Sequence, residues 1–334
     1  MAAYDTEAGE KEHILTLPNN RQLAYAHNGP KTSRTVIIFF TGVLSVGTAH
    51  RVPEPCRAVG AHWISPTPPG SGKSSTRDKS VPYNVSLARD ISALLTFLYP
   101  TNDFDKLYIS GGSYGTVPAQ MLYGAPYELF PAGRKIAGCL LLAGFSPVKY
   151  HTDYTKSLNW QNYFSFGPPT QFLPFHAVQW IFRAVVGLRL KSLKGTKAFL
   201  RQTLIDPMDD EEKATFGGWL RTNHLSEDAF LESMANGTIR CCQNWDGVME
   251  VSDVIHSDWG FEPKRLDDQH ASKPMLVVSS SHDHIGGSTN DWIVHNYKSA
   301  KPKMLPGGHI SSLFHIDELW EEMFSSEYPI YIPS

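Results

Sequence analysis

The stretch Lys106-Leu107-Tyr108-Ile109-Ser110-Gly111-Gly112-Ser113-Tyr114-Gly115 decides how this chain of 334 residues folds. Its first half is a short apolar run of residues that favour β-structure, and residues 117–122 after it suit a helix. A Gly-x-Ser-x-Gly turn between a strand and a helix is typical of a nucleophile elbow, a tight turn that lifts the serine hydroxyl clear of the sheet. Glycines on both flanks remove the Cβ atoms that would clash in such a turn. We therefore expect Ser113 to be a nucleophile.

A serine hydroxyl needs a base and an orienting carboxylate, and both types of residue follow later strands. Residues 273–280 are predicted to form a buried strand, and the polar turn after them contains Asp283. A further short strand at 303–305 is followed by a Pro-Gly-Gly turn and His309. Because loops after parallel strands open on one edge of a sheet, we expect both side chains to meet Ser113. The imidazole would take the serine proton, and the carboxylate would fix its tautomer.

Other histidines compete for these roles. His282 and His284 flank the acid, but two histidines without further ligands at a recognised spacing do not make a closed zinc site. We expect them to be loop histidines, and we expect no bound metal. His315 lies within 311–316, which we predict to be a helix interior, so a structural role is expected for it.

Two backbone N–H groups are expected to hold the negative charge that develops on the substrate oxygen. The turn at Ser113 sets the N–H of Tyr114 beside that position. The loop that leaves the predicted strand at 35–40 would supply the second donor, and the N–H of Val43 is the candidate. Each such donor contributes roughly a hundred- to a thousandfold in rate.

The chain resembles the α/β-hydrolase superfamily over nearly its whole length outside one insertion. The segments that carry the resemblance are a hairpin at 17–25, a Gly-x-Gly-x-Ser loop at 66–74, the elbow at 111–115, the acid turn at Asp283 and the Gly308-His309 turn. It implies an α/β fold with a mostly parallel twisted sheet flanked by helices, and chemistry without a cofactor. Two positions depart from the family pattern, since Thr41 stands where His is usual and Thr67 where Asp is usual.

One insertion separates two predicted strands of the sheet. The strand at 136–143 and the strand near 274 are about 120 residues apart, far beyond the ~4–6 residues of an ordinary loop. We predict a helical cap at 150–270, inserted after the sixth strand, and a hydrolase core at 1–149 and 271–334. Residues 175–190, which begin at Phe175, are predicted to be a helix. Four cap aromatics are expected to bind a sizeable apolar group of the substrate: Trp160, Phe164, Phe166 and Trp180.

Composition and charge limit the partners and the cellular location that we expect. A formal charge of −3 and a pI near 6.5 give no electrostatic case for nucleic acid. No apolar run approaches the ~20 residues of a membrane span, and residues 1–11 are too polar for a signal peptide. The four cysteines have no zinc or redox spacing, so free thiols and a cytoplasmic location are expected.

The sequence therefore predicts a serine hydrolase with an acyl-enzyme mechanism, and a carboxylesterase acting on a fairly hydrophobic small-molecule ester is the first expectation. A proline-iminopeptidase-like aminopeptidase is an alternative, because the elbow is also similar to that of those enzymes. Such an activity needs a cap acid to hold the substrate ammonium. A lyase or acyltransferase on the same scaffold is a further alternative, and peripheral membrane contact through the helix at 175–190 stays open. The available cap acids are Asp206, Asp209, Asp210, Glu211 and Glu212.

Overall fold

A single sheet organises the part of the chain that the computed structural model describes, residues 4, 9, 11–158, 160–173, 176–283 and 289–325. Its strand order is β1-β2-β4-β3-β5-β6-β7-β8. β1 and β2 pair antiparallel with their neighbours, and the remaining pairs are parallel. The strands are β1 His13–Thr16, β2 Gln22–Asn28, β3 Thr35–Phe40, β4 His62–Pro66, β5 Lys106–Gly112, β6 Ile136–Leu142, β7 Met275–Ser280 and β8 Ala300–Leu305.

The central strands agree closely with the predicted ones because they are continuous apolar runs. Parallel strands covered on both faces carry no polar alternation, and every residue of β7 is buried. The expected strand at 35–40 coincides with β3. β8 begins three residues before the expected 303–305. It is an edge strand in which Leu305 alone is buried, so its apolar signal is short.

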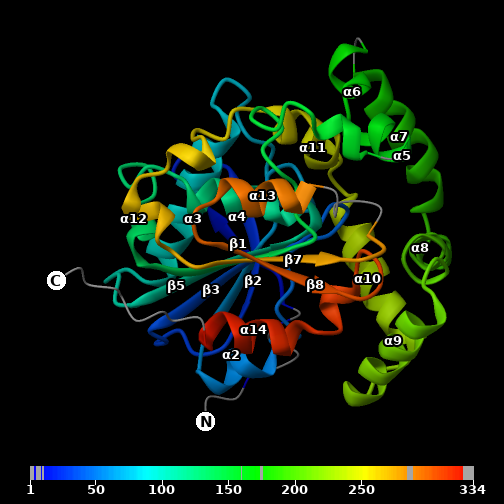
Figure 1. Ribbon diagram of the computed structural model, residues 1–334, viewed down its shortest axis with the longest axis horizontal. Coiled ribbons are helices and arrows are strands. Elements are labelled where there is room, and N and C mark those ends of the chain that lie inside the picture. The colour runs from blue at the N-terminus through cyan, green and yellow to red at the C-terminus, as the bar shows by residue number, and fades with distance from the viewer. Residues whose placement is uncertain are drawn as a thin grey trace.

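Helices cover both faces of the sheet (Figure 1). Trp320 is fully buried on one face, where it packs edge-on against Trp63 and Tyr108 with ring centroids 5.8 and 6.1 Å apart. That face is covered by α2 Glu54–Ala58 and α14 Ile316–Ser325, and the other by α3 Tyr83–Leu98, α4 Thr116–Tyr123, α12 Asp268–Ala271 and α13 Asn290–Asn296.

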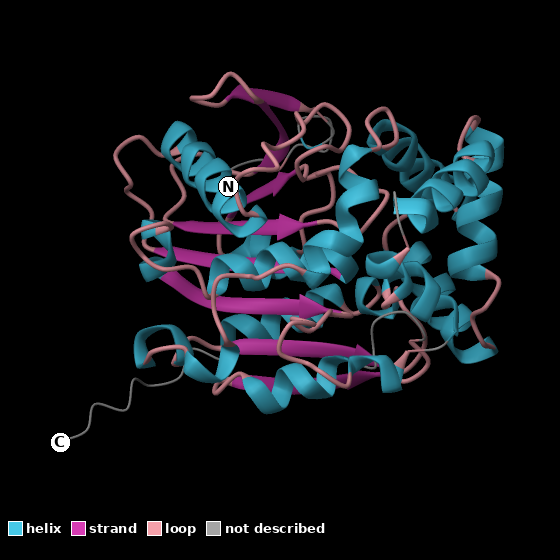
Figure 2. Cartoon of the chain, turned by 90° about the horizontal axis from the view of Figure 1, so that it is seen from above, coloured by secondary structure: helices cyan, strands magenta, loops and turns pink. Residues whose placement is uncertain are grey.

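A run of helices, which we call the helical insertion, lies between β6 and β7. The arrowheads of the parallel strands point toward it in Figure 2, so it stands at the edge where the catalytic loops are expected. The predicted helix at 175–190 corresponds to α7, although Phe175 falls outside the described residues, as does His284. Among the helices described, none is long and apolar enough to cross a membrane. The insertion contains α5 Trp160–Phe166, α6 Pro169–Phe172, α7 Ala177–Arg189, α8 Leu193–Leu200, a π-helical turn Arg201–Ile205, α9 Asp210–Thr222, α10 Glu227–Cys241 and α11 Asp246–His256.

Candidate active site

Ser113 occupies a strained turn between β5 and α4. Its φ of 53° lies in the left-handed region, which costs a non-glycine residue roughly 1–3 kcal/mol. A short 3-10 turn, Ser113–Gly115, leads from it into α4. Thr116 anchors the turn, because its Oγ1 donates a hydrogen bond to the Ser113 carbonyl (2.7 Å) and accepts one from the N–H of Phe145 (3.1 Å). Strain held in place in this way is typical of a functional turn.

Close backbone contacts explain two of the glycines in the motif. A Cβ built on Gly111 would lie 2.1 Å from the carbonyl oxygen of Gly115, and one on Gly115 would lie 2.1 Å from that of Phe40. Both positions exclude any side chain. A Cβ on Gly112 would find its nearest neighbour, a ring atom of Phe39, at 3.9 Å. The turn therefore needs Gly111 and Gly115 for space.

Asp283 and His309 meet as expected. The His309 Nδ1 lies 3.0 and 3.1 Å from the two carboxylate oxygens of Asp283. The Asp283 side chain is fully buried, and that of His309 is 14% exposed. Two backbone hydrogen bonds tie their loops together, from the N–H of Ser281 to Leu305 and from that of His282 to Gly307, both 2.9 Å. An Nδ1 that donates to the carboxylate leaves Nε2 as the ring nitrogen that can accept a proton.

The serine and this pair lie at the same edge of the sheet. Ser113 follows β5, Asp283 follows β7 and His309 follows β8, and these strands are parallel. Within the described ranges no hydrogen bond joins Ser113 to His309. Catalytic hydrogen bonds of this kind often tighten only when the substrate binds.

A carboxylate of the insertion holds the histidine loop, and sequence reasoning did not assign it this role. Glu212 on α9 is buried, and its Oε1 accepts hydrogen bonds from the Gly308 N–H (2.8 Å) and the Ser311 hydroxyl (2.7 Å). Asp209 caps the same helix by accepting from the Glu212 N–H (2.8 Å). In the sequence Glu212 belongs to a charged run at a helix start, which gives no signal for a contact 96 positions away.

The loop after β3 lies against the serine. A Cβ on Gly42 would lie 3.3 Å from the Ser113 Cβ, so the backbone that leads to Val43 passes directly beside Ser113. Thr67 braces this loop, because its Oγ1 accepts a hydrogen bond from the Gly47 N–H (2.9 Å). The threonine that replaces the usual aspartate thus has a definite role. Tyr114 supplies the other expected N–H at the start of a helix, where such groups have no intrahelical partner.

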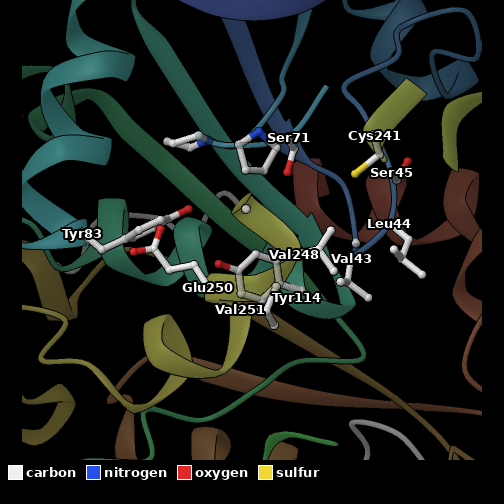
Figure 3. Close-up of a pocket in the computed structure, with 14 residues that line it drawn as sticks. Val43, Leu44, Ser45, Ser71, Tyr83, Tyr114, Cys241, Val248, Glu250 and Val251 are labelled. Carbon is white, nitrogen blue, oxygen red and sulfur yellow. The ribbon is translucent and has the colours of Figure 1, made fainter. Parts of the chain in front are cut away.

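A small pocket lies beside this loop (Figure 3). Its free volume of about 10 Å³ is close to what one water molecule needs. Glu250 of α11 enters it and forms a buried ion pair with Arg77. Burial raises the pKa of the Tyr114 phenol well above its usual value, so this ring stays neutral. The walls of the pocket are formed by Gly42, Val43, Leu44, Ser45, Pro68, Pro69, Ser71, Tyr83, Tyr114, Cys241, Gly247, Val248, Glu250 and Val251.

The cap aromatics expected to bind substrate lie elsewhere. Trp160, Phe164 and Trp180 are exposed, and Phe166 is buried edge-on against Phe145 with ring centroids 5.1 Å apart. None of the four lines the pocket. Two other aromatics of the insertion, Phe182 and Trp245, pack against a cluster of Val46, Cys241 and Val248, of which Cys241 and Val248 line the pocket.

The competing histidines have ordinary contacts. His315 precedes α14 instead of lying inside a helix, and its Nδ1 is 3.2 Å from the Glu318 carboxylate. The Nδ1 of His282 faces Asp209 at 3.4 Å. In the described part of the chain no cluster of three potential metal ligands occurs. All four cysteines are free thiols, and a cytoplasmic location stays a prediction.

Comparison with known proteins identifies the fold. No protein-family model and no curated protein matches the chain by sequence. Comparison of the structure with solved structures does find matches. A candidate acyltransferase from Salmonella enterica aligns over 97% of both chains with a TM-score of 0.62 and 17% identity. The chain has the α/β-hydrolase fold.

Other α/β-hydrolase-fold structures align over similar lengths. An esterase from a Rhodococcus species covers 95% of this chain and 99% of its own, with a TM-score of 0.59 and 13% identity. A hydrolase from Pseudomonas aeruginosa covers 95% and 98%, with a TM-score of 0.55 and 16% identity. The fold class predicted from the sequence is confirmed. Identities this low establish the fold alone.

Proposed function

We propose that this protein is a serine hydrolase, and specifically a carboxylesterase. The observation that carries the proposal is the buried Asp283–His309 pair, at the same sheet edge as a serine held at positive φ on a strand-to-helix turn. The core would consist of residues 1–149 and 271–334, and the helical insertion at 150–270 would be its cap.

Each group has a role in an acyl-enzyme mechanism. His309 takes the proton of Ser113 through Nε2 as the serine oxygen attacks the ester carbonyl. The N–H groups of Val43 and Tyr114 stabilise the oxyanion, and Asp283 stabilises the imidazolium that forms. His309 then protonates the leaving alcohol, and it later activates the water that releases the acid and regenerates Ser113.

The pocket supports a fairly hydrophobic substrate. Val43, Leu44, Val248 and Val251 contribute apolar side chains beside the proposed oxyanion site. A free volume of about 10 Å³ is far less than an acyl group requires. We therefore propose that substrate binding moves α11 away from the loop after β3.

Three of the five acids that an aminopeptidase could use already have partners, which weighs against that activity. Glu212 already binds the histidine loop, Asp209 caps α9, and Asp206 pairs with Arg201. Glu250 lies in the pocket but is neutralised by Arg77. No net negative charge is therefore available there for a substrate ammonium.

Acyl transfer is the second candidate, because closing of the pocket around a bound substrate would exclude the water that hydrolysis needs. A structural neighbour described as a candidate acyltransferase supports considering it. Lyase chemistry stays an alternative on the same ground. Hydrolysis and acyl transfer share the acyl-enzyme and differ in whether water or another acceptor takes the acyl group.

The test compares wild-type protein with Ser113→Ala on p-nitrophenyl esters of increasing chain length, with aminoacyl arylamides in parallel. Ester turnover that is lost by a factor on the order of a millionfold in Ser113→Ala would support the hydrolase. Turnover confined to arylamides with free N-termini would refute the esterase. A burst of p-nitrophenol without turnover, followed by turnover when an alcohol is added as acceptor, would favour acyl transfer.

A further inference from the structure

Helix α7 carries apolar side chains on its exposed face as well as on its buried one. Its residues at positions 180, 181, 184, 185 and 188 form one face at helical spacing, and all five are exposed. The opposite face buries Gln179, whose amide donates a hydrogen bond to the Thr170 carbonyl (3.3 Å). Val186 is buried on the same face, so the helix has apolar side chains on both sides and exposes one apolar stripe to solvent. The large side chains of the stripe, Trp180, Ile181, Val185 and Leu188, are 54–65% exposed.

Neighbouring helices extend this apolar character. Trp160 and Phe164 stand one turn apart on α5 and are exposed, and Phe172 at the end of α6 is 82% exposed. α5, α6 and α7 lie together at the side of the molecule away from the sheet (Figure 1). We call the exposed apolar residues of these three helices the outer surface. Large apolar surfaces of this kind mark interaction sites.

The charge of the segment points to one kind of partner. Residues 154–205 contain seven Lys or Arg and no Asp or Glu, in a chain whose net charge is −3. Lys197 and Arg201 are paired with acids of α10 or its neighbourhood. Arg183 lies over the Trp180 ring at 5.0 Å, and Lys191 and Lys194 are exposed just beyond α7. Apolar and aromatic side chains with a cationic border match the interfacial region of an anionic membrane.

We propose that the outer surface docks on membranes that contain anionic phospholipid. The apolar stripe of α7 enters the boundary between headgroups and acyl chains, while Arg183, Lys191 and Lys194 contact the headgroups. A second copy of this chain is a poorer occupant, since a two-fold contact through the same surface would bring these cations together. The proposal does not depend on the proposed hydrolase activity, because binding is measured without turnover.

The experiment is sedimentation of the full chain with vesicles of phosphatidylcholine alone or with about one third phosphatidylserine. We expect binding to the anionic vesicles that weakens at roughly 0.5 M salt. The double variant Ile181→Ser/Leu188→Ser and the double variant Lys191→Glu/Lys194→Glu should each lower the affinity at least about tenfold. Phe97→Ser is the matched control, because Phe97 on α3 is 57% exposed but lies off the outer surface.

Each other result would overturn the proposal. We call Ile181→Ser/Leu188→Ser the stripe variant. This surface would be excluded as a docking site for anionic lipid if the wild type does not bind, if it binds neutral vesicles equally well, or if Phe97→Ser and the stripe variant lose the same affinity. A wild-type dimer that the stripe variant converts to a monomer, without vesicle binding, would assign the surface to a second copy. Ser113→Ala should bind vesicles like the wild type, which separates this result from the test of the hydrolase.

Discussion

Two alanine substitutions in the elbow differ only in the space around the new methyl group. Gly115 has φ −59° and ψ −19°, and Gly112 has φ −111° and ψ 138°, so alanine fits the backbone at both. In Gly115→Ala the new Cβ would lie 2.1 Å from the Phe40 oxygen and 2.8 Å from the Thr41 oxygen. In Gly112→Ala its nearest neighbour is 3.9 Å away.

The clash allows the magnitude to be worked out. Real Cβ contacts stay above 3.0 Å, so the elbow and the Phe40–Thr41 backbone must separate by about 1 Å. These segments carry Ser113 and Val43, and a displacement of about 1 Å typically costs on the order of a hundredfold in rate. Overpacking also lowers the free energy of unfolding by roughly 1–3 kcal/mol. Gly112→Ala should leave the rate within about threefold, with at most a small gain in stability from a less flexible unfolded chain.

The assay is the second-order rate of Ser113 labelling by a fluorophosphonate, which needs no knowledge of the natural substrate, together with kcat/KM on a p-nitrophenyl ester. Urea midpoints measure the loss of stability separately. A Gly115→Ala protein that is folded and labelled at the wild-type rate would refute the argument. So would a Gly112→Ala protein as impaired as Gly115→Ala.

Three further predictions concern the acid, the histidine loop and a buried histidine. Asp283→Asn should lower kcat on the order of ten-thousandfold through the wrong imidazole tautomer, and unchanged ester kinetics would remove Asp283 from the triad. Glu212→Ala leaves the Gly308 N–H without its acceptor and should lower kcat about tenfold, whereas Glu212→Gln, which retains an acceptor oxygen, should recover most of it; equal kcat values would contradict the positioning role. Burial lowers the pKa of His62 from 6.5 to about 3, so the unfolded chain takes up the proton first as the pH falls. The contribution of this neutral histidine to stability is fully present above pH 6.5 and is lost as the pH drops toward 3. Between pH 6.5 and 4.5 the free energy of unfolding should fall by roughly 2–3 kcal/mol because of this group. If urea titrations show that the free energy of unfolding of His62→Phe falls with pH as steeply as that of the wild type, the assignment to His62 is wrong.

The fold could be predicted because its decisive features are local. The turn at 111–115 joins a strand to a helix, and continuous apolar runs mark the central strands. Asp283 and His309 follow from the rule that loops after parallel strands share one edge. Chain order and residue type are enough to bring them together. Glu212 could not be found in this way, because its contact with Gly308 depends on how α9 is placed over the core.

The sequence could not place the cap aromatics for a related reason, and α7 shows it most clearly. A period of 3.6 residues tells that a helix has an apolar face, but it does not tell which medium that face meets. On α7 the aromatic Phe182 packs against the cluster of Val46, Cys241 and Val248 beside the pocket, while Trp180, two positions earlier, belongs to the exposed stripe. A rotation of the helix about its axis would exchange these roles without any change in sequence. The aromatic content therefore predicts that this segment has apolar partners, and only the tertiary structure divides them between the pocket and the outer surface. Because α7 packs through Phe182 against residues beside the pocket and carries the proposed membrane contact on its other side, docking and substrate access would act on the same helix.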